Sequence, residues 1–154
     1  MMLYASITQR SRLLQPYVRA CEREHGLLTI LSAEPDKEKR RISTSAEMRV
    51  HDARLIVNGA SNSHHRFVEL FEHTRETCVS GGFGESLWIG DWAYLSYGHF
   101  DLALQNERYV YEHQYSPVLC CYRNRGFSSL SPGDIGELFR MHNIVIFPET
   151  TFVR

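Results

Sequence analysis

The sequence contains no apolar run close to the roughly 20 residues that a membrane-spanning helix needs, and no basic segment followed by an apolar one at its start. It also has no excess of charge of one sign, because 17 basic and 18 acidic side chains leave a formal net charge of -1. A chain without a basic surface has no general attraction for phosphate backbones. These absences predict a cytoplasmic protein that neither enters a membrane nor binds nucleic acid directly.

Cysteine is scarce, and its four positions do not form a disulfide framework or a Cys-x-x-Cys pair, so reduced thiols are expected. Cys120 and Cys121 are neighbours in an expected strand, where successive side chains point to opposite faces. They are therefore not placed to share a metal ion. Each is interpreted either as a reactive or redox-sensing thiol or as an inert buried one.

Motifs for phosphate binding and acyl transfer are missing. The Gly-rich stretch at 81–84 precedes a strand, whereas a phosphate-binding loop must follow a strand and open a helix. No Gly-x-x-x-x-Gly-Lys-Ser/Thr loop and no Gly-x-Ser-x-Gly turn occurs. The sequence therefore predicts no complete catalytic centre, no cofactor and no metal site.

What the chain does contain is the composition of one globular domain, residues 1–154, with 43% hydrophobic and 23% charged residues. Short apolar segments alternate with stretches of helical periodicity. Strands are expected at 1–4, 27–31, 54–57, 86–90, 117–122 and 144–147. Helices are expected at 13–21, 62–78, 100–113 and 132–139, and the polar segment 33–47 is expected to be a solvated helix or loop. This alternation predicts an α/β fold with a mainly parallel central sheet.

Three stretches resemble a known family: Met2-Leu3-Tyr4-Ala5-Ser6, then Ile89-Gly90-Asp91-Trp92, then Leu119-Cys120-Cys121-Tyr122 with 131–146 behind it. Together they resemble the MEDS family, the methanogen/methylotroph sensory domain, over nearly the whole chain. Ala5 stands where the family commonly has an acid, and Arg123 where Asp is usual. The resemblance implies a three-layer RecA-like sandwich without the phosphate-binding loop, and a role in sensing small molecules for gene regulation.

Asp91 is expected just past the carboxyl end of a central strand, where open α/β sheets build their ligand crevices. The alternative for a lone carboxylate is a structural hydrogen bond. Tyr4 and Tyr122 are expected on neighbouring strands and are predicted to share one wall of the site. The predicted ligand-binding residues are Tyr4, Ser6, Asp91, Trp92, Tyr122 and His142.

The favoured function is a sensory or signal-transduction domain without catalysis. It would bind a small hydrophobic or weakly polar molecule and relay that event to a separate regulatory or signalling protein. Two alternatives remain open from the sequence. One is a degenerate RecA-like nucleotide-binding protein or ATPase, and the other is a ligand-free interaction module that forms a homo-oligomer.

Overall fold

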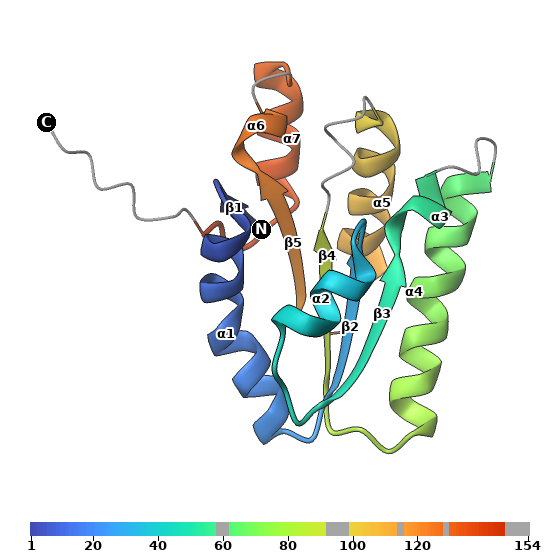
Figure 1. Cartoon of the computed structure of the whole chain (residues 1–154). Coiled ribbons are helices and arrows are strands. Elements are labelled where there is room, and N and C mark those ends of the chain that lie inside the picture. The colour runs from blue at the N-terminus through green and yellow to red at the C-terminus, as the bar shows by residue number, and fades with distance from the viewer. Residues whose placement is uncertain (58–61, 92–98, 114–115, 128–129, 147–154) are drawn as a thin grey trace, which may run out of the picture.

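The computed structural model describes residues 1–57, 62–91, 99–113, 116–127 and 130–146. Five strands form one sheet in the order β1-β5-β4-β2-β3, and every pairing is parallel (Figure 1). The strands are β1 (Met2–Tyr4), β2 (Leu27–Ser32), β3 (Glu47–Asp52), β4 (Ser86–Asp91) and β5 (Val118–Arg123). The predicted α/β fold with a mainly parallel central sheet is confirmed.

Helices cover both faces of this sheet, which gives three layers (Figure 1). One face carries α1 (Ile7–Arg23) and α2 (Pro35–Arg41). The other carries α3 (Ala53–Val57), α4 (Ser63–Ser80), α5 (Phe100–His113) and α7 (Pro132–Arg140), and the short α6 (Asn124–Phe127) follows β5. No helix in the described part of the chain is long and apolar enough to cross a membrane.

Alternate residues of β1, β2, β4 and β5 supply two separate cores, because successive side chains point to opposite faces. Ile89 of β4 packs with Leu14 on the α1 side. The preceding residue, Trp88, stacks on Phe71 of α4 with ring centroids 5.5 Å apart. All six residues of β2 and all six of β4 are buried, as expected for central parallel strands covered on both faces.

The strand predicted at 54–57 is wrong. These residues form most of α3, and the strand lies earlier, at Glu47–Asp52, starting at the last residue of the segment expected to be solvated. The edge position of β3 explains the error, since most of its residues are only half-buried and only Met48 and Val50 pack against a core. With apolar residues at only two alternate positions, Met48 and Val50, the alternation that marks a strand is too short to stand out in the sequence.

The predicted last strand, 144–147, is present only as a bridge between Ile146 and Met2, and residue 147 lies outside the described part. The bridge is parallel: Leu3 N donates to Ile146 O and Ile146 N donates to Met1 O, each at 2.9 Å. This segment covers the outer edge of β1, so the backbone groups of that short strand are paired on both sides.

Candidate functional site

The two tyrosines of the predicted site enter different layers. Their strands are neighbours as predicted, but Tyr122 lies opposite Leu3 rather than opposite Tyr4. Tyr4 therefore packs on the α1 side of the sheet and Tyr122 on the side of α5 and α7. The predicted shared wall is wrong, because a register offset of one residue moves a side chain to the opposite face.

Asp91 belongs to a buried polar network on the α1 side. Tyr4 donates its hydroxyl to Asp91 Oδ1 at 2.9 Å, and Arg10 Nε lies 3.4 Å from Asp91 Oδ2. Arg10, which is fully buried, also donates to Glu38 Oε2 at 2.8 Å. Glu38 is 1% exposed, so the helix in the segment expected to be solvated supplies one buried acid. Both oxygens of Asp91 meet internal groups, which favours the structural interpretation of this carboxylate.

The ionisation of this network follows from its burial. Burial, reinforced by the charge of Asp91, raises the pKa of Tyr4 far above its ordinary value, so the phenol remains a donor. Burial alone would lower the pKa of Arg10, but the negative charges of Asp91 and Glu38 outweigh it and raise that pKa. Burial also raises the pKa of the adjacent Cys121 thiol to about 12, despite the opposing effect of Arg10. Of the two interpretations given for this cysteine, a reactive thiol or an inert buried one, Cys121 fits the inert buried thiol.

Ser6 has a local role. It is the exposed N-cap of α1, and its hydroxyl accepts a hydrogen bond from Gln9 N at 3.2 Å. Trp92 lies outside the described residues. At the carboxyl ends of the strands, the described members of the predicted site are thus engaged in capping and in the Asp91 network.

The remaining two predicted residues, Tyr122 and His142, meet in a second buried cluster with Glu107 and Cys120, here called the Glu107 cluster. Cys120 Sγ donates to Glu107 Oε2 at 3.1 Å, and His142 Nε2 lies 3.3 Å from the same oxygen. Tyr122 donates its hydroxyl to the other oxygen, Oε1. Glu107 and Cys120 are each 1% exposed and Tyr122 is fully buried, so water has little access to these bonds.

His142 is oriented by the helix before it. Its Nδ1 lies 2.7 Å from the backbone oxygen of Leu138 in α7. A carbonyl oxygen only accepts, so Nδ1 carries the hydrogen of this bond and Nε2 is the nitrogen turned toward Glu107. The helix itself begins after its N-cap Ser131, whose side chain forms a reciprocal capping box with Asp134.

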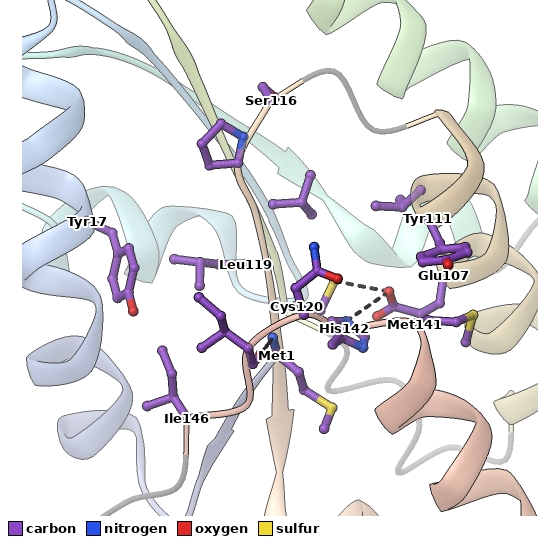
Figure 2. Close-up of a pocket in the computed structure, with 15 residues that line it drawn as sticks. Met1, Tyr17, Glu107, Tyr111, Ser116, Leu119, Cys120, Met141, His142 and Ile146 are labelled. Atoms are coloured by element: carbon purple, nitrogen blue, oxygen red, sulfur yellow. Dashed lines mark hydrogen bonds and ion pairs between the residues drawn. The ribbon is translucent and has the colours of Figure 1, made fainter.

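A cavity of about 950 Å³ opens beside the Glu107 cluster (Figure 2). Ser116 and Pro117, which precede β5, line it together with Met1, so it lies beside the amino ends of β1 and β5. Its apolar wall includes Met1, Val110, Val118, Leu119, Ile144 and Ile146, and its polar lining includes Glu107, Cys120 and His142. Figure 2 shows Glu107 entering from α5, with broken lines to Cys120 and His142.

A smaller cavity of about 470 Å³ lies at the amino ends of α4 and α5, and His99 and Asp101 are in its wall. It borders the ranges 58–61 and 92–98, which are outside the described residues. It therefore gives no complete site geometry.

Carboxylate, thiol and imidazole are all groups that bind transition metals. Among the described residues, Glu107, Cys120 and His142 each offer a ligand atom, and these atoms lie within 4.8 Å of one another. His65, Glu69 and His73 are spaced by four residues on α4 and carry similar groups, but His65 and Glu69 are 72% and 64% exposed and pair with each other at the surface.

Glu107 is not among the site residues predicted from the sequence. The residue occupies the middle of the inward stripe of α5, flanked by Ala103, Leu104 and Val110, all buried. An acid at the centre of an apolar stripe is a detectable signal, since Glu is almost never buried without partners. What the pattern could not supply was the identity of those partners, which come from β5 and from the segment after α7.

Comparisons of the chain with protein-family models, with curated proteins and with solved structures give no match. The geometry and chemistry of the cavity and the Glu107 cluster are therefore what bear on function.

Proposed function

We propose that this chain is a small-molecule sensory domain whose ligand binds in the cavity beside the amino ends of β1 and β5, not at the carboxyl ends around Asp91. The observation that carries the proposal is the cavity of about 950 Å³ with a buried acid, thiol and imidazole in its wall. Ligand sites typically have volumes of about 300–1,000 Å³, with mostly apolar walls and a few convergent polar groups. This cavity has both properties.

The lining selects the class of ligand. Val110, Leu119 and Ile146 offer apolar surface, and Glu107 and His142 offer hydrogen bonds on one side. This combination suits a small hydrophobic or weakly polar molecule with one polar group. No Lys or Arg is among the described lining residues, so these residues offer no bidentate or ammonium contact to the phosphates of a nucleotide.

The segment after α7 is the proposed relay. Residues 141–144 and Ile146 line the cavity, and the same segment is fixed to the sheet by the Ile146 bridge and by the bond from the Met1 amino group to Ile144 O, 2.7 Å. A ligand that binds one position of this segment more tightly shifts its population. Ile144 is 70% exposed, so a separate regulatory or signalling protein could contact the segment directly.

The test is a thermal-shift screen of short-chain and aromatic alcohols, ketones and carboxylates, with calorimetric titration of each hit. Val118 is half-buried in the cavity wall, and Val118→Phe fills part of the cavity. We expect this variant to weaken binding by about tenfold or more, since overpacking costs about 1–3 kcal/mol. The matched control is Val79→Phe on α4, where the side chain is 79% exposed and is not among the lining residues, and it should bind as the unaltered chain does.

Two results would oppose the proposal: no compound in the panel binds, or hits bind Val118→Phe and the unaltered chain equally. Binding of ATP with Mg²⁺ alone would instead favour the degenerate nucleotide-binding protein. A stable oligomer that is insensitive to every compound would favour the interaction module.

A further inference from the structure

We propose that the Glu107 cluster is a binding site for one transition-metal ion of the zinc class, with Glu107, Cys120 and His142 as its three protein ligands. This deepens the proposed function, because the ion would contact the ligand in the cavity. The ion itself is testable without any organic ligand, so the two proposals can fail separately.

The separations of the three ligand atoms fit one ion. Zinc binds thiolate sulfur at about 2.3 Å and imidazole nitrogen or carboxylate oxygen at about 2.0–2.2 Å, so tetrahedral ligands lie about 3.3–3.8 Å apart. Glu107 Oε2 is 3.1 Å from Cys120 Sγ and 3.3 Å from His142 Nε2. All three atoms lie within 4.8 Å of one another, so small side-chain shifts suffice to surround an ion.

The donor types select the metal. One sulfur, one nitrogen and one oxygen ligand suit zinc or a similar transition metal, whereas Mg²⁺ and Ca²⁺ prefer oxygen ligands throughout. Three protein ligands leave a fourth tetrahedral position for water or another molecule, which is the arrangement of exchangeable and catalytic zinc sites rather than structural ones.

Two further contacts orient the ligands. Leu138 O accepts the Nδ1 hydrogen of His142, which leaves Nε2 as the ring nitrogen directed into the cluster. Tyr122 donates to Glu107 Oε1 and thereby leaves Oε2 facing Cys120 and His142. Metal-binding histidines and carboxylates are commonly fixed by such outer contacts.

The contacts of Glu107 are ones that an ion can replace. Glu107 is 1% exposed, and its described partners are the thiol of Cys120, the phenol of Tyr122 and the imidazole of His142. A divalent ion at Oε2 would let the sulfur and nitrogen coordinate it instead of bonding to the acid. The thiol proton would pass to water, since the thiolate is the metal ligand.

All three ligands line the cavity, so the fourth position of the ion faces it. The molecule bound there would then carry a group that coordinates zinc, such as a hydroxyl, a carboxylate or a thiol, on an apolar body. This narrows the proposed ligand to small apolar molecules that carry such a group.

The experiment is a titration of the metal-stripped full chain, with any affinity tag removed, first with Co²⁺ and then with Zn²⁺. We expect one Co²⁺ per chain, visible bands of tetrahedral intensity, a thiolate-to-cobalt charge-transfer band in the near ultraviolet, and displacement by one equivalent of Zn²⁺. Cys120→Ser should abolish the charge-transfer band. Cys121→Ser, the same change at an equally buried neighbour on the other face, should keep it.

The outer contacts give a graded second test. Tyr122→Phe should lower zinc affinity about 10–100-fold, as is typical for the loss of an outer partner. Glu107→Gln and His142→Ala should lower it further, since each removes a ligand. Circular dichroism checks that each variant is folded.

The Co²⁺ spectrum of the unaltered chain is the first result to examine, because it requires no substitution. Absence of the charge-transfer band in it overturns the proposal, and so does a band that persists in Cys120→Ser. Co²⁺ bound without that band also overturns it, because the exposed pair His65–Glu69 would give such a spectrum.

Discussion

Asp91 and Glu107 are both buried acids next to the sheet, and their surroundings separate their roles. Asp91 is neutralised by Arg10 and held by Tyr4, so its charge is already compensated inside the protein. Glu107 lines a cavity, and its described partners are a thiol, a phenol and the imidazole of His142. The first arrangement stabilises the fold, and the second places an acid in the wall of a cavity.

Loss of Asp91 should therefore destabilise the protein without affecting the cavity. Asp91→Ala leaves the buried guanidinium of Arg10 with Glu38 alone, and removal of one partner of a buried ion pair costs about 3–5 kcal/mol. Tyr4→Phe removes only a hydrogen-bond donor to Asp91 and should cost about 1–3 kcal/mol. Urea unfolding measures both. An Asp91→Ala variant of unchanged stability, or one that has lost cavity-ligand affinity while fully folded, would contradict this assignment.

Thiol reactivity should differ sharply between two of the cysteines. Cys121 is fully buried and burial raises its pKa to about 12, so almost no thiolate forms near neutral pH. Cys78 is only half-buried near the end of α4. Alkylation of the native chain, followed by peptide mass spectrometry, should label Cys78 first and Cys121 only on unfolding. Early labelling of Cys121 in the folded chain would show that the β5 core is more open than described.

At the scale of elements, the sequence pattern predicts those segments whose signals are local. The apolar run of β2, the stripe of α5 and the cap of α7 at Ser131 each lie within a few residues, and all three elements occur close to their predicted bounds. The edge strand β3 was misplaced, because an edge needs few apolar residues. The Glu107 cluster could not be predicted, since its four members come from α5, β5 and the segment after α7, which tertiary packing brings together.

Two glycines allow a matched test of element packing. A Cβ at Gly84 would lie 2.4 Å from the backbone oxygen of Glu24, which cannot move without displacing the end of α1. We expect Gly84→Ala to destabilise the protein by about 1–3 kcal/mol. Gly136 lies in α7 with nothing within 4 Å of a Cβ, so Gly136→Ala should stabilise by about 0.5–1 kcal/mol. Urea midpoints that move in the same direction for both variants would contradict the described packing of the α1 end against the turn before β4.

At the scale of the whole molecule, stability should fall in mild acid partly through His51 on β3. Burial, with the nearby charges of Arg49 and His73, lowers the pKa of His51 in the folded state. As the pH falls below the unfolded value of about 6.5, the unfolded chain takes up a proton that the folded chain does not, so the free energy of unfolding decreases. His51→Gln should flatten this dependence between about pH 7.5 and about pH 5.5 in urea unfolding. If His51→Gln left the pH dependence of the free energy of unfolding unchanged, groups other than His51 would cause the loss of stability in acid.

The sheet divides the molecule into two layers with different tasks. The α1 layer holds the compensated network of Arg10 and Asp91 and also contributes Leu119 and Ile146 to the cavity wall. The layer of α5 and α7 holds the Glu107 cluster, which supplies the acid, thiol and imidazole of that wall. The proposed ligand site thus lies at the amino ends of β1 and β5, whereas ligand crevices in open α/β sheets usually lie at the carboxyl ends of the strands. The location of the bound ligand is therefore the property that best distinguishes this site from one at the carboxyl ends of the strands.

Hydrogen–deuterium exchange with and without a cavity ligand from the screen tests that location most directly. We expect slower exchange in peptides that cover 116–120 and 141–146, because these segments line the cavity and the second also pairs with β1. Peptides around Ser6 and Asp91 should exchange at the same rate in both states. Protection confined to Ser6 and Asp91, with none at 141–146, would contradict the proposed site and return it to the carboxyl ends of the strands.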